Sequence, residues 1–314
     1  MKVPVTPTEA QLRRRYLELL HGDPAVDGGD RHTDGEYARW RELKRLVIVY
    51  GLPRGSEAEP NVAPASSHSS EQGEGDEAED EQKRAPCSLR GQIWKAFLGV
   101  DAADRTAEYA ELVERGASQF DSDIRNDTFR TFRGDPAFAQ RVPESKLVRL
   151  LNVFINELGS GPDVDGECKA DQPDGLPKDI RYVQGMNILC APLLYVLPEA
   201  DAYYTFCRLI VRHCPKYMAP QVMGAKQGCL LVDKCLELLD PDLYHHLLAH
   251  EITAQIYALP LILSLFACVP PLPELLRVWD VLFAMGVHFV VVLAVAHTVL
   301  LREQLLQKIQ SIWR

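Results

Sequence analysis

Two short segments bring together residue types that could do chemistry. The first is Ile124–Arg130, which reads IRNDTFR, and the second is Tyr182–Asn187, which reads YVQGMN. Ile124, Asp127 and Arg130 recur at intervals of three residues, so on a helix they lie near one face, where Asp127 can brace the Arg130 guanidinium. Taken alone, an aspartate three residues before an arginine is most often a surface ion pair. A single Tyr-x-Gln is equally uninformative, so these residues gain meaning only from the sequence around them.

Other kinds of active site have no counterpart in the sequence. A phosphate-binding loop of the G-x-x-x-x-G-K-[ST] type is absent, so the protein is not expected to bind GTP itself. His246 and His250 are spaced as in a zinc-binding H-E-x-x-H helix, but Leu247 replaces the glutamate, which favours ordinary helix histidines. The G-x-S-x-G of serine hydrolases is also missing. The sequence therefore predicts no metal and no cofactor of its own.

Apolar residues at helical spacing dominate the chain, and no alternating strand pattern competes with them. Helices within residues 1–54 are predicted to lead into a main helical domain over residues 87–314. Between them, residues 55–86 are rich in Ser, Glu and Pro, and this composition predicts a disordered acidic insert. A second acidic loop at 159–179 is predicted to be disordered inside the main domain. The expected helices are Glu9–Leu20, Glu36–Val49, Arg90–Leu98, Ala102–Arg115, Ser145–Leu158, Val183–Leu197, Ala202–His213, Gln227–Leu239, Pro241–His250, Thr253–Phe266, Pro273–Phe283 and Val287–Gln310.

The formal net charge of -10 is concentrated in the two predicted inserts. Residues 55–86 hold nine acidic and two basic residues, and residues 159–179 hold six acidic and two basic residues, so the rest of the chain is close to neutral. Phosphate binding needs clustered Lys and Arg, and this balance argues against nucleic acid as a partner.

Cysteine usage and the apolar segments favour a cytoplasmic protein. The eight cysteines are scattered without a C-x-x-C pair, which predicts reduced core thiols. The first residues lack the features of a secretory signal. The apolar run Val287–Leu301 is shorter than the roughly 20 residues of a membrane span. A buried helix is predicted there, and the chain is not expected to be a membrane protein.

Four motifs in a fixed order are similar to those of one known family. Leu89–Trp94, LRGQIW, resembles the R-x-x-x-W opening of TBC domains, the Rab-type GTPase-activating proteins. Ile124–Arg130 resembles their I-x-x-D-x-x-R element and Tyr182–Gln184 their Y-x-Q element, while Leu272–Gly286 resembles their later L-R-I-W-D-x-x-F-x-x-G stretch. The resemblance implies an all-α, TBC-type helical domain.

The resemblance also implies a function carried out on another protein. In this family an arginine and a glutamine enter the nucleotide pocket of a partner small GTPase, and the matching residues are Arg130 and Gln184. The chain is then an enzyme activator acting in trans, because GTP and Mg²⁺ belong to the GTPase. Arg90 and Trp94 are interpreted as fold residues. The residues that the resemblance assigns to partner binding or to support of the site, each of them also open to a structural role, are Ile124, Asp127, Tyr182, Gly185 and Asn187.

One stretch departs from the common family pattern. Many members place Trp before an L-x-L-F run, whereas residues 257–266 read YALPLILSLF. Together with the wording IRNDTFRTF, this stretch resembles the fungal mitotic-exit and septation checkpoint subfamily, whose members act at the spindle pole on a Ras-like GTPase with a separate scaffold subunit. A scaffold subunit and a spindle pole location are therefore expected. The alternative is a non-catalytic TBC module that scaffolds a GTPase complex without speeding hydrolysis.

Overall fold

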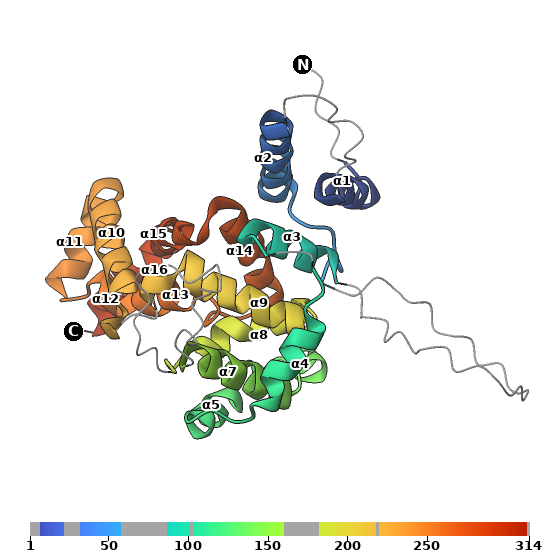
Figure 1. The fold of residues 1–314 in the computed structure, drawn as a ribbon. Helices are drawn as coiled ribbons and strands as arrows, with labels where there is room; N and C mark the ends of the chain where they lie inside the picture. The colour runs from blue at the N-terminus through green and yellow to red at the C-terminus, as the bar shows by residue number, and fades with distance from the viewer. Residues whose placement is uncertain are drawn as a thin grey trace, which may run out of the picture.

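All regular structure in the described part of the chain is helical. The computed structural model describes residues 7–21, 32–57, 87–100, 103–159, 182–217 and 220–312, and no strand occurs within them. The predicted all-α fold is therefore confirmed (Figure 1). The elements are α1 Glu9–His21, α2 His32–Tyr50, α3 Leu89–Leu98, α4 Thr106–Glu114, α5 Asp121–Thr128, α6 Pro136–Arg141, α7 Glu144–Gly159, α8 Met186–Val196, α9 Glu199–Arg208, η1 Leu209–His213, η2 Pro215–Tyr217, η3 Pro220–Val222, α10 Met223–Leu239, α11 Pro241–Ala249, α12 Ala254–Tyr257, α13 Leu259–Leu263, α14 Leu272–Met285, η4 Val287–Phe289, α15 Val290–Leu300 and α16 Arg302–Ile312.

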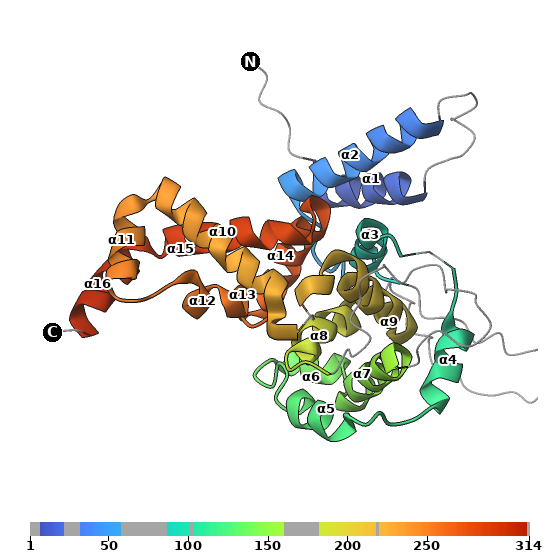
Figure 2. The ribbon, with the colours of Figure 1, turned by 60° about the vertical axis from the view of Figure 1, so that its left-hand side comes forward.

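Helix α8 is the centre of the helical body. Its side chains are buried except those of Ile188 and Tyr195, which are partly exposed. Helices α7 and α9 pack against it, and α3 and α5 contact it as well (Figure 2). A helix that is apolar on all sides needs such enclosure on all sides. The enclosed start of α8 therefore fixes the position of the residues that directly precede it.

The two N-terminal helices lie against the main body. Tyr16 of α1 and Val47 of α2 belong to a small core that also contains Leu89 and Ile93 of α3 and Ala284 of α14. Figure 2 shows α1 and α2 side by side above α3 and the end of α14. Burial of these apolar side chains is the force that holds the pair in place.

A buried ion pair joins α3 to α14. Arg90 donates from Nε to Asp280 Oδ1 at 3.0 Å and from Nη2 to Asp280 Oδ2 at 3.1 Å. Trp94 Nε1 donates to the same Oδ1 at 2.8 Å, and all three side chains are buried. Because an enclosed carboxylate needs donors of this kind, the cluster confirms that Arg90 and Trp94 are fold residues.

The first residues of the insert predicted at 55–86 are ordered against α3. Ser56 is fully buried, and its carbonyl accepts a hydrogen bond from the Arg90 amide at 2.9 Å. Glu57 Oε2 accepts from Arg90 Nη1 at 2.7 Å. These contacts make residues 55–57 an ordered turn against α3, which corrects that boundary. Residues 58–86, and residues 160–179 of the second predicted insert, lie outside the described residues.

The long helix predicted at 253–266 is two short helices, α12 and α13. Pro260 lies in the first turn of α13, where its missing amide hydrogen is tolerated, whereas within a longer helix it removes a hydrogen bond. Beyond α13, Leu265 and Phe266 adopt left-handed backbone with φ 50° and 66°, which ends the helix. The prediction of one continuous helix is wrong for these reasons.

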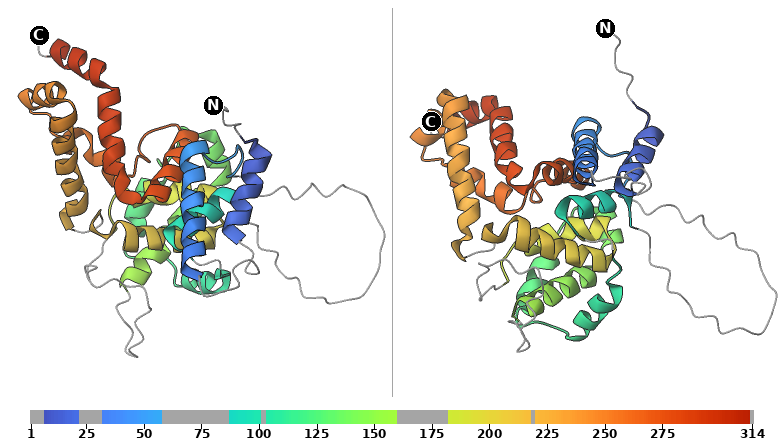
Figure 3. Two further views of the ribbon diagram at one scale, coloured as in Figure 1. Left: turned by 90° about the horizontal axis from the view of Figure 1, so that it is seen from above. Right: turned by 45° about the horizontal axis from the view of Figure 1, so that its top comes forward.

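The helix predicted at 287–310 is also divided, into η4, α15 and α16. The break lies at Leu301, between α15 and α16. Arg302, the first residue of α16, donates to Asp240 Oδ2 at 2.7 Å, which fixes the new direction of the chain against the start of α11. Figure 3 shows α10, α15 and α16 extending away from α1–α9.

Further helix boundaries also differ from the predictions. The helix predicted at 102–115 starts only at Thr106, whose amide is capped by Asp104 Oδ1 at 3.0 Å. The helix predicted at 202–213 starts earlier, at Glu199, and passes at its end into the π turn η1.

The apolar run predicted as a buried helix is buried on one face only. Val290 and Ala294 of α15 are fully buried, whereas Val292 is 52% exposed and Val299 is 37% exposed. Helices α10 and α13 pack against α15, and its remaining face is open. Within the described ranges, no helix has both the length and the apolar character needed to cross a bilayer.

The cysteines in the described residues are free thiols. Cys190, Cys214 and Cys229 are buried, and burial raises the pKa of the Cys214 thiol to about 12. Cys268 is exposed, so the prediction of core thiols does not hold for this cysteine.

Candidate functional site

Arg130 lies in the turn that follows α5. The helix ends at Thr128, and the chain then bends so that Phe132 adopts left-handed backbone with φ 48°. The predicted shared helical face therefore holds for Ile124 and Asp127 but not for Arg130. Even so, Arg130 Nη2 donates to Asp127 Oδ1, and the Arg130 side chain remains 54% exposed whereas that of Asp127 is 9% exposed. The aspartate is enclosed, and the arginine is open to an incoming molecule.

Asp127 connects this turn to the segment that carries Gln184. Its Oδ1 accepts from Arg130, and its Oδ2 accepts from the Tyr182 hydroxyl at 3.0 Å. Burial of the Tyr182 hydroxyl raises its pKa well above the usual range, and the negative charge of Asp127 raises it further. The hydroxyl therefore stays protonated and acts as a hydrogen-bond donor to Asp127. One carboxylate thus holds both the arginine and the tyrosine that precedes Gln184.

Asn187 forms a second link between the two segments. Its Nδ2 donates to Thr131 Oγ1 at 2.7 Å and to the Asp127 carbonyl at 3.3 Å, while its Oδ1 accepts from the Gly185 amide at 3.2 Å. Gly185 has φ 104°, a conformation that strains any residue with a Cβ atom. Because Asn187 belongs to the first turn of buried α8, it fixes the Arg130 turn relative to the core.

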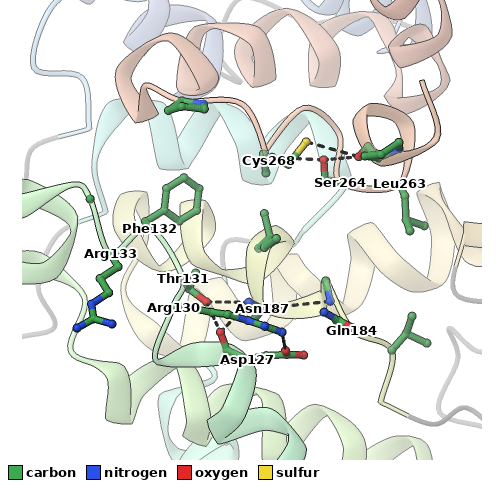
Figure 4. Close-up of a pocket in the computed structure, with 17 residues that line it drawn as sticks. Asp127, Arg130, Thr131, Phe132, Arg133, Gln184, Asn187, Leu263, Ser264 and Cys268 are labelled. Atoms are coloured by element: carbon green, nitrogen blue, oxygen red, sulfur yellow. Dashed lines mark hydrogen bonds and ion pairs between the residues drawn. The ribbon is translucent and has the colours of Figure 1, made fainter. Parts of the chain in front are cut away.

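The helix predicted from Val183 begins only at Met186, and this later start leaves Gln184 in a turn. Gln184 is exposed, and it lines the same pocket as Arg130 (Figure 4). Its amide offers both a donor and an acceptor, and it carries no charge. The two residues predicted to be catalytic therefore come from separate segments and meet at one pocket.

The residues predicted to bind the partner or support the site differ in their exposure. Asp127, Gly185 and Asn187 line the pocket. Tyr182 does not line the pocket, but it donates a hydrogen bond to Asp127, which does. Ile124 has no exposed surface, so in this structure it packs α5 against the core and offers no contact surface.

Thr131 is a member of this site that the sequence does not reveal. It lines the pocket, accepts a hydrogen bond from Asn187, and donates from Oγ1 to the Asp127 carbonyl at 3.0 Å. A hydroxyl beside an arginine forms no distinctive sequence pattern. Its role depends on a partner far away in the chain, and that signal exists only in three dimensions.

The pocket has a volume of about 640 Å³ and two walls of different chemistry. One wall comes from the turn after α5 and the start of α8, and the other comes from α13 and the segment that leads to α14 (Figure 4). The first wall consists of Asp127, Arg130, Thr131, Phe132, Arg133, Gly134, Val183, Gln184, Gly185, Asn187 and Ile188. The second consists of Pro260, Leu263, Ser264, Ala267, Cys268 and Pro270.

The first wall is suited to an anionic group and a polar molecule beside it. Arg130 and Arg133 supply positive charge, and Gln184 supplies an amide. No histidine lines the pocket, and in the described part of the chain no group of three or more His, Cys, Asp and Glu is placed to hold a metal ion. His246 and His250 lie at the end of α11 with their rings tilted and the ring centroids 4.7 Å apart, outside this pocket.

Comparison with known proteins places this fold in a family. Residues 175–306 match the model of the Rab-GTPase-TBC domain, a range that contains Gln184 and begins after Arg130. A putative mitotic check point protein BUB2 from Dictyostelium discoideum is 33% identical over 304 residues, which cover 96% of this chain and 71% of the relative. Cell division control protein 16 from Schizosaccharomyces pombe is 40% identical over 221 residues, which cover 70% of this chain and 67% of the relative.

A solved structure supports the same assignment at the level of the fold. The Chlamydomonas flagellar RabGAP TBC domain matches with a TM-score of 0.57 at 19% identity, over 98% of this chain and 87% of that one. At this identity the likeness concerns the fold alone, while the relatives above share more of the sequence. The predicted resemblance is confirmed, and this chain belongs to the Rab-GTPase-TBC domain family.

Proposed function

We propose that this chain is a GTPase-activating protein that stimulates GTP hydrolysis by a Ras- or Rab-like small GTPase, with Arg130 and Gln184 acting in the partner's nucleotide pocket. The observation that carries this proposal is that Arg130 and Gln184 line one pocket. Hydrogen bonds of Asp127 and Asn187 connect the turn that carries Arg130 to the segment that carries Gln184. The chain has no phosphate-binding loop, so GTP and Mg²⁺ come with the GTPase.

Arg130 is the residue that stabilises the transferring phosphoryl group. Negative charge on the phosphoryl oxygens and on the leaving group makes GTP hydrolysis slow, and a guanidinium offers permanent charge with several directed donors. The side chain is 54% exposed, so it enters the GTPase without breaking any core packing of its own protein. Insertion of such an arginine accelerates hydrolysis by roughly 10³ to 10⁵.

Gln184 is the residue that positions the attacking water. Its amide oxygen accepts from the water, and its amide nitrogen donates to a phosphate oxygen. In this role it replaces the equivalent glutamine of the GTPase. The turn at Gly185 presents the side chain at the edge of the pocket, ahead of α8.

The hydrogen-bond network beneath these residues keeps them in place before the GTPase arrives. Asp127, Tyr182 and Asn187 connect the two segments through contacts of 2.7–3.3 Å that involve Thr131 as well. Donors that are already oriented cost no reorganisation when charge develops in the transition state. These residues act as positioning groups for Arg130 and Gln184.

The cellular setting that we propose is a mitotic checkpoint. Two relatives are named as a putative mitotic check point protein and a cell division control protein. The IRNDTFRTF and YALPLILSLF wording supports the same subfamily, with a scaffold subunit completing a two-component activator and a cytoplasmic location at the spindle pole. In that setting this chain is the catalytic subunit.

Single-turnover hydrolysis tests the proposal. Purified small GTPases of the Ras and Rab classes are loaded with GTP, and release of phosphate is followed with and without this chain. The proposal predicts stimulation of at least one GTPase, alone or with a co-purified scaffold subunit. Binding of a GTPase without stimulation under either condition would favour the alternative, a non-catalytic module that holds a GTPase complex.

A further inference from the structure

The pocket wall that faces Arg130 and Gln184 carries no charged side chain. It is formed by α13 and the segment that leads to α14, and we name it the α13 wall. Leu263 is partly exposed there, and Cys268 and Pro270 are exposed. Its residues are Pro260, Leu263, Ser264, Ala267, Cys268 and Pro270.

The α13 wall is firmly built. Ser264 Oγ donates to the Pro260 carbonyl at 2.7 Å, which closes the end of α13. Trp279, a fully buried residue of α14, donates from Nε1 to the Leu265 carbonyl at 2.8 Å. Leu265 and Phe266 both have left-handed backbone, a conformation that persists in such residues only where the surroundings impose it. The wall therefore keeps its shape as a preformed surface.

The requirements of GTP hydrolysis do not explain the α13 wall. A phosphate and its attacking water are served by Arg130 and Gln184 on the opposite wall. An apolar surface gains nothing from contact with a phosphate, but it is stabilised when an apolar group displaces water from it. The pocket of about 640 Å³ holds more than one phosphate group and falls in the size range of sites that bind larger ligands.

We infer that the α13 wall is a binding subsite for an apolar side chain of the GTPase, one that the GTPase carries beside its nucleotide. This inference rests on the proposed function, and it assigns affinity and choice of partner to the α13 wall. Continuity supports this occupant, because the same pocket holds Arg130 and Gln184 and any GTPase engaged there covers both walls. Phe129, next to Arg130 in the sequence, is 54% exposed and lies outside the pocket lining.

The subsite discriminates between GTPases by the cost of burying charge. A GTPase with an aliphatic or aromatic side chain at the contact removes apolar surface from water on both molecules. A GTPase with a charged side chain there loses hydration and finds no ionic partner on the α13 wall, which opposes binding. The α13 wall thus selects the partner, while Arg130 and Gln184 on the opposite wall accelerate hydrolysis.

Steady-state kinetics with two α13-wall variants test the inference. The probe is the GTP-loaded small GTPase that the wild-type protein stimulates most. Leu263→Gln makes the wall polar, and Cys268→Trp fills the pocket from an exposed position. Leu238→Gln, the same change at an 83% exposed leucine of α10, is the matched control. Both wall variants should raise the half-saturating concentration about tenfold and leave the maximal rate within about twofold.

Alkylation of Cys268 gives a readout that does not depend on hydrolysis. N-ethylmaleimide modification of the peptide that contains Cys268 is followed by mass spectrometry, with and without the GTPase probe. The GTPase should slow this modification about tenfold when it is present well above its dissociation constant. Arg130→Ala should retain this protection, because Arg130 acts mainly in the transition state. Leu263→Gln should retain only about twofold protection at the same GTPase concentration.

The outcomes separate this inference from the proposed function. Stimulation by the wild-type protein, with unchanged half-saturation for folded Leu263→Gln and Cys268→Trp, would overturn the subsite and leave the proposed function standing. Slower alkylation of Cys268 at higher concentration of this chain alone would overturn it in favour of a second copy on the wall. A wild-type protein that stimulates no GTPase would remove both ideas together.

Discussion

Two arginine–aspartate pairs of the same chemistry lie in contrasting surroundings. Arg90 and Asp280 join α3 to α14, and their side chains are 6% and 2% exposed. Arg130 pairs with Asp127 at the pocket, where the side chains are 54% and 9% exposed. Burial distinguishes the two arginines, because the first is enclosed with its partner and the second is open to solvent.

The number of donors already engaged also distinguishes the two arginines. Arg90 uses Nε and Nη2 for Asp280 and Nη1 for Glu57, so its guanidinium is committed to the fold. Arg130 contacts Asp127 through Nη2, and its side chain as a whole is 54% exposed. The buried Arg90–Asp280 pair joins two helices, whereas the Arg130–Asp127 pair leaves its arginine exposed at the pocket, as the proposed function requires.

Replacement of Arg130 should give the largest effect on function. Arg130→Ala is expected to lower stimulated hydrolysis by about two to four orders of magnitude, because the lost charge acts mainly in the transition state. Arg130→Lys should remain severely impaired, since an ammonium keeps the charge and loses the planar fork. The free energy of unfolding should be unchanged in both variants, and this is checked by urea denaturation.

Replacement of Gln184 should follow closely in size. Gln184→Ala is expected to be strongly impaired in single-turnover hydrolysis. The decrease in stimulated hydrolysis in the Arg130→Ala, Gln184→Ala double variant should be much smaller than the product of the two single decreases, because both side chains serve one transition state. Multiplicative defects in well-folded proteins would show that the two residues act independently of each other.

Replacement of Arg90 should act on stability. Arg90→Ala leaves Asp280 buried without its cation, and loss of one partner of such a pair costs about 3–5 kcal/mol. Urea denaturation measures the loss, with Arg14→Ala as the control, because the Arg14–Glu18 pair is exposed and should contribute little. An Arg90→Ala protein with unchanged stability and low GTPase-activating activity would show that Arg90 serves function, and would contradict its assignment as a structural residue.

The smallest effect is expected for Tyr182. Tyr182→Phe removes one donor from Asp127 and leaves the Arg130 pair and the Asn187 link in place. Loss of a hydrogen bond to a charged carboxylate is worth about 1.5–3 kcal/mol, and Asp127 keeps its bond to Arg130, so a decrease in maximal rate of about tenfold, near the lower end of that range, is expected. An unchanged half-saturating GTPase concentration would confirm that the tyrosine positions Arg130 and does not bind the partner.

The sequence predicts the helical fold and the two central residues, for different reasons. Apolar spacing is local information, so most helices are placed correctly and the fold class with them. The breaks at Leu265 and Leu301 depend on contacts with Trp279 and Asp240, which lie elsewhere in the chain. Such breaks have no local signal that outweighs the helical pattern.

The candidate site is predictable only in part. Arg130 and Gln184 stand out through family resemblance, because Asp-x-x-Arg and Tyr-x-Gln mean little alone. The link from Asn187 to Thr131 and the α13 wall bring together residues from distant parts of the chain. No periodicity or spacing in one sequence reports such contacts, so they are visible only in the folded protein.

Transition-state binding tests the central contrast most directly. The affinity of the responsive GTPase for this chain is measured in its GDP state and in its GDP–aluminium fluoride state, with wild-type protein and with Arg130→Ala. The proposed role of Arg130 predicts that the wild-type protein binds the aluminium fluoride state at least about a hundredfold more tightly, and that Arg130→Ala loses this preference while it keeps its stability. An equal preference in folded Arg130→Ala protein would rule out this role, because the exposed arginine would then contribute nothing to the transition state.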